Sequence, residues 1–286
     1  MSTNSPEKTL KSRRIIDSPE VPPYKPSMFQ SPGAIAVHVG PVAIRWYGVL
    51  MATAMALGLW LAHRDARRRG LDPERLLKAS ELALLGGLIG ARLYYVLFNL
   101  DYYSQAPGRI FALWEGGLAI HGGVIGGVLA GGIYAWRRRL PLRQYLDVAA
   151  PSLAIGQAIG RWGNFFNEEA FGRPTDLPWK LFISPPHRPM PYAQAEFFHP
   201  TFLYESLWDL AVFGLLVLGL RDRLARAPGA LFLAYIGLYS LGRLFTEGLR
   251  TDALMLGSLR VAQLVSLLCM AVALVGVPLL LRRRPA

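Results

Sequence analysis

The sequence predicts an all-α fold, a polytopic membrane bundle of seven transmembrane helices, and three observations support this. Hydrophobic residues make up 52% of the 286 positions, and the mean hydropathy of +0.29 is high for a soluble domain. The apolar residues fall in blocks of about 20, the length of helix that crosses a bilayer. The net charge of +12 comes from basic residues placed between these blocks, which membrane topology explains better than nucleic-acid binding.

The segment before the first apolar block is polar and rich in proline. It contains no apolar core followed by a small-residue cleavage site, so we predict no signal peptide. We expect residues 1–30 to form a disordered extension, and residues 31–286 to form the membrane domain. Cys269 is the one cysteine, which excludes an intrachain disulfide, and no zinc-type Cys/His spacing is present. The sequence therefore predicts no metal and no cofactor.

Seven apolar segments follow the extension, and each is predicted to form one spanning helix. They are Ile44–His63, Ala79–Phe98, Gly117–Trp136, Tyr145–Phe166, Thr201–Leu220, Gly229–Leu249 and Val261–Leu281. In the fourth segment, Asp147, Pro151 and Arg161 interrupt the apolar run, and the proline would kink a helix there.

The orientation follows from the unequal distribution of Lys and Arg among the connections. The basic residues concentrate in residues 64–78, 137–143, 221–226 and 282–284. These stretches fall on one side of a seven-span chain, which the positive-inside rule makes cytoplasmic. The N-terminus is then outside and the C-terminus is cytoplasmic.

Small residues recur at helical spacing in the middle spans. Gly123, Gly127 and Gly131 are four residues apart, and Gly156 and Gly160 repeat that spacing. Such patterns let two helices approach closely in lipid, so we interpret them as packing surfaces.

The stretch GRWGNFFNEEAFG, residues 160–172, carries an unusual cluster of polar groups at the end of the fourth span. Arg161 and Asn164 lie within its last turns, and Asn167 and Glu169 follow. A charge inside a membrane is costly unless it is paired or hydrated. A lone arginine could simply extend its guanidinium to a lipid headgroup, but a cluster of this kind favours a functional site.

Other spans send polar side chains to the same outer side of the membrane. These residues are Arg45 and Tyr47 in the first span, His121 in the third, His199 before the fifth, and Tyr239, Arg243 and Glu247 on one face of the sixth. Each has a structural explanation: an i, i+4 ion pair for Arg243 and Glu247, an interfacial histidine, an aromatic belt for Tyr47. Together they indicate a lipid-accessible site for an anion such as phosphate, which arginine binds with a planar pair of donors.

With this cluster of polar residues, the chain resembles the bacterial prolipoprotein diacylglyceryl transferase family. The stretch 160–172 matches the family signature G-R-x-G-N-F-x-N-x-E-x-x-G at every fixed position. Further family-like pieces occur in the right order: RWYG at 45–48, HGG at 121–123, HPTFLYE at 199–205 and YSLGRLFTEGLR at 239–250. The resemblance covers residues 30–281, and seven spans with the N-terminus outside agree with it.

The resemblance implies a reaction in the bacterial inner membrane, with the active site towards the outer leaflet. The diacylglyceryl group of phosphatidylglycerol moves to the lipobox cysteine thiol of a prolipoprotein, a thioether forms, and glycerol phosphate leaves. The thiol belongs to the substrate, which agrees with the lack of a reactive cysteine in the chain.

Roles for the candidate residues follow from this chemistry. The thiolate is the nucleophile, so we assign His121 as the first candidate for the base and Glu169 as the second. Arg161 and Arg243 would stabilise the leaving phosphate. The remaining substrate-site candidates are Asn164 and Asn167 as donors, Glu247 orienting Arg243, Tyr47 and Tyr239 beside the headgroup, and the motif residues Gly172 and His199.

Two other functions fit part of the pattern. A lipid or anion transporter would also place arginines in a membrane, although such proteins more often show internal repeats and broken helices at the midplane. A phospholipase would use water in place of the thiol, and only the family resemblance separates the two acceptors.

Overall fold

A computed structural model describes residues 29–113 and 116–282, and within them each of the seven predicted segments is a helix. The long helices are α1 (Trp46–Arg68), α2 (Pro73–Leu97), α4 (Ile120–Arg137), α5 (Leu142–Asn167), α6 (Thr201–Gly214) continued by the π-helical turns of η5 (Leu215–Leu220), α7 (Ala230–Leu249) and α8 (Val261–Arg282). The shorter helical pieces are α3 (Leu100–Gln105), η1 (Pro107–Phe111), η3 (Pro185–His187) and η4 (Met190–Tyr192). Helix α5 continues through Pro151.

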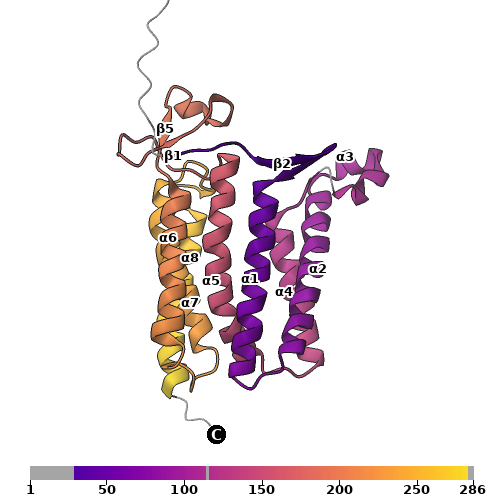
Figure 1. The fold of residues 1–286 in the computed structure, drawn as a ribbon, viewed down its shortest axis with the longest axis vertical. Coiled ribbons are helices and arrows are strands. Elements are labelled where there is room, and N and C mark those ends of the chain that lie inside the picture. Colours follow the sequence, from indigo (N-terminus) through magenta and orange to yellow (C-terminus); the bar gives the residue numbers. More distant parts are fainter. Residues whose placement is uncertain (1–28, 114–115, 283–286) are drawn as a thin grey trace, which may run out of the picture.

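Short strands, which the sequence did not predict, lie at one end of the bundle, called here the strand-bearing end (Figure 1). β1 (Phe29–Gln30) pairs in parallel with β4 (Leu181–Phe182), and β4 pairs with β5 (Phe197–Phe198). The same end also carries two separate hairpins. One pairs β2 (Ile35–Val39) with β3 (Val42–Arg45), and the other pairs β6 (Met255–Leu256) with β7 (Leu259–Arg260). Phe29 and Gln30 therefore belong to a sheet and not to the expected extension, of which residues 1–28 lie outside the described part.

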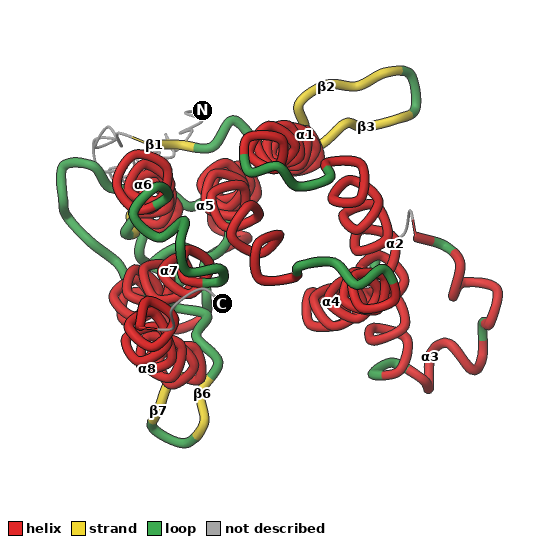
Figure 2. Tube along the Cα trace, turned by 90° about the horizontal axis from the view of Figure 1, so that it is seen from below, coloured by secondary structure: helices red, strands yellow, loops and turns green. Residues whose placement is uncertain are grey.

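The long helices run alternately up and down and form two groups (Figures 1 and 2). Helix α2 packs along α4, and α1 joins this pair to α5. On the other side of α5, helices α6, α7 and α8 pack against one another in sequence. Because the long helices alternate, the C-terminal ends of α5 and α7 and the N-terminal end of α6 meet at the strand-bearing end.

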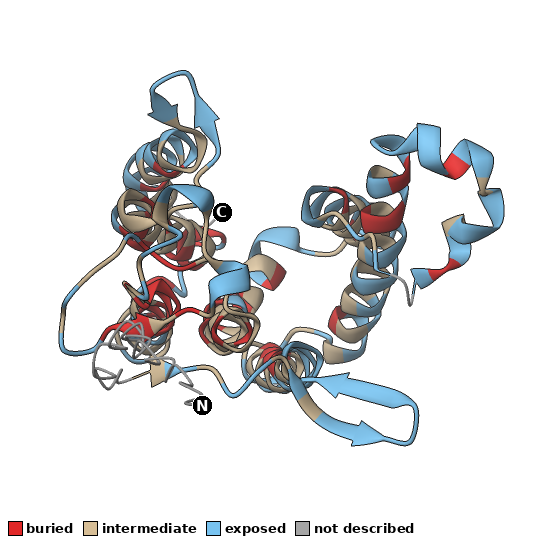
Figure 3. Cartoon of the chain, turned by 90° about the horizontal axis from the view of Figure 1, so that it is seen from above, coloured by how far each residue is buried: buried red, intermediate tan, exposed pale blue. Residues whose placement is uncertain are grey.

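Many large apolar residues are exposed on the outside of the bundle, as expected for a protein surrounded by lipid. Figure 3 shows how exposed and buried residues are distributed over the helices. Ile89, Val128 and Leu274 expose 59, 69 and 74% of their surface, whereas Glu205 and Glu247 expose 5 and 1%. Three helices in the described ranges, α1, α6 with η5, and α8, have the length and apolar composition needed to cross a bilayer. The chain is therefore a helical membrane protein.

Small residues bring α2 and α4 into direct backbone contact. The predicted surface of Gly123, Gly127 and Gly131 faces α2, since a Cβ atom added to Gly127 would lie 3.0 Å from the carbonyl oxygen of Ala83. The tightest contacts, however, lie at the neighbouring glycines. A Cβ atom added to Gly90 would lie 2.3 Å from the carbonyl oxygen of Gly122, and one added to Gly126 would lie 2.2 Å from that of Gly86. The second surface was wrong: Gly156 has open space around its Cβ position, and Gly160 meets only the sulfur of Met51, at 4.0 Å.

We expect Gly126→Ala to lower stability, because the new methyl group would collide with rigid backbone and separate α2 from α4. Overpacking of this kind costs about 1–3 kcal/mol. The matched control is Gly132→Ala on the same helix, where no atom lies within 4 Å and alanine favours the helix. Thermal unfolding of both variants in detergent measures the difference, and equal midpoints would contradict the packing role.

A buried arginine near the strand-bearing end of α2 holds the loop that follows α3. Arg92 is 5% exposed, and its guanidinium donates hydrogen bonds to five carbonyl oxygens, those of Arg109, Ile110, Ala112, Gly116 and Gly117. Every guanidinium donor group is thereby satisfied by backbone, which lowers the cost of burying the charge. Arg92 thus acts as a structural arginine.

Candidate active site

The polar motif 160–172 occupies the last turns of α5 and a sharp reversal after it. Glu168 adopts left-handed backbone angles (φ 51°, ψ 48°), and Ala170 has φ 57°. The reversal turns Glu169 back towards the helix, where its Oε1 accepts a hydrogen bond from Asn164 Nδ2 at 2.9 Å and one from Asn167 Nδ2 at 3.5 Å. The two asparagines predicted to bind phosphate are therefore engaged with Glu169 in this structure.

Two motif glycines are needed for close packing around this turn. A Cβ at Gly163 would lie 2.5 Å from the ring of Tyr47, so the tyrosine at the start of α1 packs directly against α5. At Gly172, a Cβ would lie 2.7 Å from the Cβ of His199. Gly172 and Tyr47 thus hold the shape of the site, and these contacts assign neither of them to a ligand.

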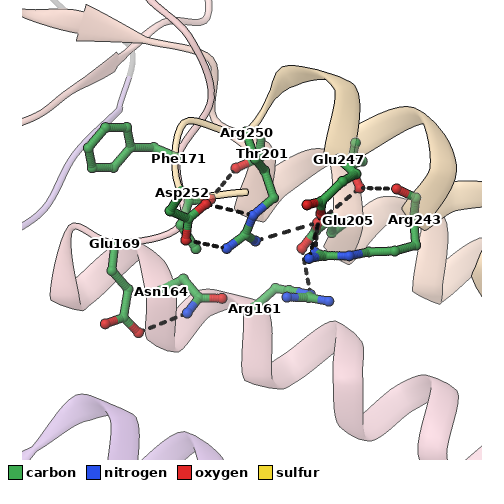
Figure 4. A network of polar contacts seen from close by, with 12 residues as sticks. Arg161, Asn164, Glu169, Phe171, Thr201, Glu205, Arg243, Glu247, Arg250 and Asp252 are labelled. Carbon is green, nitrogen blue, oxygen red and sulfur yellow. Dashed lines mark hydrogen bonds and ion pairs between the residues drawn. The ribbon is translucent and has the colours of Figure 1, made fainter. Parts of the chain in front are cut away.

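Three arginines converge on one buried carboxylate, Glu205 of α6 (Figure 4). Arg161 Nε lies 2.8 Å from Glu205 Oε2, and Arg243 Nη1 lies 3.0 Å from Oε1. Arg250 Nη1 lies 3.8 Å from the same Oε1, and Thr246 Oγ1 donates a hydrogen bond to it at 3.0 Å. Glu205 therefore ties α5, α6 and α7 together at the strand-bearing end.

Two further carboxylates complete this network. Glu247 Oε2 lies 2.6 Å from Arg243 Nη2, which confirms the predicted i, i+4 pair. Asp252 binds Arg250 through two hydrogen bonds of 2.9 and 2.7 Å. These hydrogen bonds raise the pKa of Arg250 although burial opposes the charge. Three guanidinium groups and three carboxylates are thus in contact, and the formal charge of the network is zero.

The network fixes each guanidinium and still leaves donor groups available. Arg161 donates to Tyr239 Oη at 3.3 Å through Nη2, whereas its Nη1 forms no hydrogen bond or ion pair with a described residue. Arg243 uses Nη1 and Nη2 for carboxylates, and its Nε makes no such contact. Guanidinium groups held by carboxylates in this way are preorganised hydrogen-bond donors for an anion.

A cleft of about 630 Å³ lies beside the motif at the strand-bearing end. Its polar lining residues include Arg45, Asn167, Glu169, Ser184, His187 and Asp252. On one wall, Glu168 Oε2 accepts a hydrogen bond from Ser184 N at 3.1 Å and lies 2.8 Å from His187 Nδ1. The cleft gives the motif an open approach from outside the bundle.

The two predicted histidines do not join the arginine network. His121 lies on α4, which packs against α2, and its ring centroid is 6.0 Å from that of Tyr94. His199 Nδ1 lies 3.2 Å from Tyr204 Oη, and burial lowers the pKa of this histidine. Among the described residues, the structure therefore groups Arg161, Tyr239, Arg243 and Glu247 in one network and leaves the histidines outside it.

Sequence reasoning missed Glu205, Arg250 and Asp252. Glu205 and Arg250 end two of the family-like pieces, HPTFLYE and YSLGRLFTEGLR, but neither was assigned a role. The available signal was an acidic residue at the fifth position of an apolar helix, because a carboxylate buried in a membrane needs a cationic partner. The same reasoning identifies Asp209, which lies one helical turn after Glu205 and is 3% exposed, as a second buried carboxylate in this helix.

Comparison with known proteins gives one consistent result. The family model described as prolipoprotein diacylglyceryl transferase matches residues 34–279. A protein from Trichormus variabilis is 54% identical over 263 residues, which cover 90% of this chain and 93% of the relative. One from Synechococcus elongatus is 53% identical over 252 residues, covering 87% of both chains. Both relatives bear the name phosphatidylglycerol–prolipoprotein diacylglyceryl transferase.

Proposed function

The chain belongs to the prolipoprotein diacylglyceryl transferase family, and from this premise we infer that it transfers the diacylglyceryl group of phosphatidylglycerol to prolipoproteins. The observation that supports this most directly is the convergence of Arg161 and Arg243 on Glu205 beside the polar motif. The acceptor is the thiol of a lipobox cysteine in the signal-peptide region of the prolipoprotein.

The chemistry that we propose forms one carbon–sulfur bond and breaks one carbon–oxygen bond. The substrate thiolate attacks the carbon of the diacylglyceryl unit that is bonded to the phosphate oxygen. The electron pair of the broken carbon–oxygen bond stays on that oxygen, and glycerol phosphate leaves. Arg161 and Arg243 stabilise this charge through the donor groups that the carboxylates leave available. Glu247 and Glu205 keep the two guanidinium groups in place, and Tyr239 borders the headgroup.

Asn164 and Asn167 reach the same region, but their amide nitrogens face Glu169. We propose that they hold Glu169 in position in the absence of substrate and can turn to the phosphate when it is bound. Glu169 and His121 remain the two candidates for the base that deprotonates the thiol. Gly172 and His199 contribute the packing that closes the loop behind the motif.

The test of the transferase assignment uses purified protein, phosphatidylglycerol and a synthetic lipobox peptide. Mass spectrometry should show the peptide gaining one diacylglyceryl group, with one glycerol phosphate released for each. The matched control is the same peptide with serine in place of cysteine, which should give neither product. Release of glycerol phosphate without the thiol peptide would indicate a phospholipase. Formation of neither product, although phosphatidylglycerol and the thiol peptide are both present, would favour a transporter.

We propose that all seven long helices span the bacterial inner membrane, with the strand-bearing end outside. Single cysteines at exposed positions in a Cys269→Ser background test this arrangement. A membrane-impermeant thiol reagent should label His187→Cys in intact cells, and it should label Arg138→Cys only after the membrane is opened. Labelling of Arg138→Cys from outside would reverse the orientation and place the arginine network on the cytoplasmic side.

If His121 is the base, His121→Gln should lower the transfer rate by about 10²–10⁴-fold, the usual contribution of general base catalysis. Binding of phosphatidylglycerol should change little, so the effect should appear in kcat and not in KM. His38→Gln, an exposed histidine in β2, is the matched control. A rate for His121→Gln close to that of the unaltered enzyme, with a large loss in Glu169→Gln, would transfer the role to Glu169.

A further inference from the structure

A second concave region lies at the end of the bundle opposite the strand-bearing end. Two cavities of about 390 and 190 Å³ adjoin there, and both have Asp65, Arg68 and Arg221 in their walls. They lie between the last turns of α1, the first half of α5 and the end of η5. Because α5 and α6 run the length of the bundle, this region is separated from the arginine network by several helical turns.

The walls of these cavities carry more basic than acidic side chains, and two of the basic ones lack an acidic partner. Asp65 lies 2.8 Å from Arg69 Nε and 3.7 Å from Arg221 Nη1, so these two arginines are partly neutralised. In contrast, Arg64 stacks over the ring of Trp60 at 5.7 Å, and Arg68 is exposed without a partner among the described residues. Two guanidinium groups therefore face the cavities with their charge uncompensated.

The other acidic groups nearby do not compensate these charges. Asp147 lies in the wall of the larger cavity, but its two oxygens accept hydrogen bonds from the backbone N–H groups of Gly229 at 2.7 Å and Phe232 at 2.9 Å. Asp222 is 91% exposed and lies 3.6 Å from Arg221 Nε. The cavity walls thus retain a net positive charge.

The smaller cavity combines this basic rim with an apolar wall formed by Leu61, Val148, Phe213 and Val217. Two polar atoms of the cavity residues are buried without a hydrogen-bond partner in the described part of the chain, Nη2 of Arg69 and Oγ of Ser152. A buried donor without an acceptor is costly, so these two residues carry donor groups that the described part of the chain leaves unsatisfied. The region therefore suits a molecule with an anionic group at one end and an apolar chain at the other.

We propose that these adjoining cavities bind one anionic phospholipid, at a site separate from the active site. The headgroup phosphate lies among Arg64, Arg68 and Arg221, and one acyl chain extends along Phe213 and Val217. Basic pockets between helices at the membrane boundary recognise anionic headgroups in this manner. Val217 belongs to η5, and π-helical turns occur often at functional sites. Phosphatidylglycerol has the required chemistry, and at this site it is bound and not consumed.

The test counts the lipids that the purified full-length protein retains, using native mass spectrometry after exchange into phosphatidylglycerol or phosphatidylcholine micelles. Arg64→Ala/Arg68→Ala should weaken retention of one phosphatidylglycerol by about 30-fold, since each arginine near a membrane surface contributes roughly fivefold. Arg137→Ala/Arg138→Ala, at the same end of the bundle but outside the cavities, is the matched control and should retain the lipid. Turnover with the lipobox peptide should stay near the unaltered rate in both.

A second variant separates a lipid from a free anion. Val217→Trp keeps all the arginines and fills the apolar wall, so it should also weaken retention of phosphatidylglycerol. Soluble glycerol phosphate in excess should not displace the lipid from the unaltered protein. The proposal is overturned if the Arg64/Arg68 variant retains the lipid normally, if the control pair loses it equally, if phosphatidylcholine is retained as well, or if glycerol phosphate displaces the lipid while Val217→Trp has no effect.

Discussion

Arg161→Lys and Arg161→Ala are each expected to lower the transfer rate by about 10²–10³-fold, the usual loss when a preorganised donor to a developing anion is removed. Lysine keeps the positive charge, but its three donors lie on one nitrogen, so it does not reproduce the planar fork that lets Arg161 contact Glu205, Tyr239 and a phosphate in different directions. The lysine variant should therefore fail although the formal charge of the network is unchanged. The measurement is kcat with the lipobox peptide in detergent micelles containing phosphatidylglycerol.

Folding and insertion must be controlled in this experiment. Arg109→Ala, at an exposed position in the loop after α3, should remain active and serves as the matched arginine control. Size-exclusion profiles and membrane fractions should be equal for all three variants. An Arg161→Ala protein that is correctly inserted and transfers at the unaltered rate would refute the role of this arginine and leave the family assignment intact.

Glu205→Ala is expected to have the second large effect, on stability as well as on rate. Removing the carboxylate leaves Arg161, Arg243 and Arg250 close together without their common partner. Breaking a buried ion pair by deleting one member typically costs about 3–5 kcal/mol. The unfolding midpoint in detergent should fall sharply, and activity should be lost because neither Arg161 nor Arg243 keeps its geometry.

Two further variants distinguish positioning from simple loss of charge. Glu205→Gln keeps the size of the side chain, so it should unfold closer to the unaltered protein and still transfer slowly. Glu81→Gln removes an exposed carboxylate that pairs with Lys78 at 2.9 Å, and it should change neither property, since exposed pairs contribute little. Equal stability of Glu205→Ala and Glu81→Gln would show that Glu205 does not hold the arginines.

The helices could be predicted because their signals are local. A block of about 20 apolar residues specifies a helix in lipid whatever its neighbours are, and the observed bounds, such as Thr201–Leu220 and Val261–Arg282, differ little from the expected ones. The strands were missed for the opposite reason. β1, β4 and β5 contain two residues each and exist only because distant segments meet, so no periodicity in the sequence indicates them.

The site was predictable in part. Arg243 and Glu247 are one helical turn apart, so their contact follows from spacing alone. The convergence of Arg161 and Arg250 on Glu205 depends on how three helices rotate against one another, which a single sequence does not specify. The same limit applies to Gly156 and Gly160, where the spacing suits a close contact but the helix face meets no partner backbone.

The shared carboxylate also bears on how the protein is made. Arg161, Glu205 and Arg243 lie on three successive helices, α5, α6 and α7, so α5 leaves the ribosome with Arg161 before its partner Glu205 has been synthesised. A charge at the centre of a lipid-exposed helix costs about 2.5–3.5 kcal/mol during translocon-mediated insertion, and a charge nearer the helix end, such as Arg161 in the last turns of α5, costs less. Pairing before release removes most of that cost, so α5, α6 and α7 should leave the insertion machinery as a group. The residues that hold the arginines in place would then also determine the order of assembly.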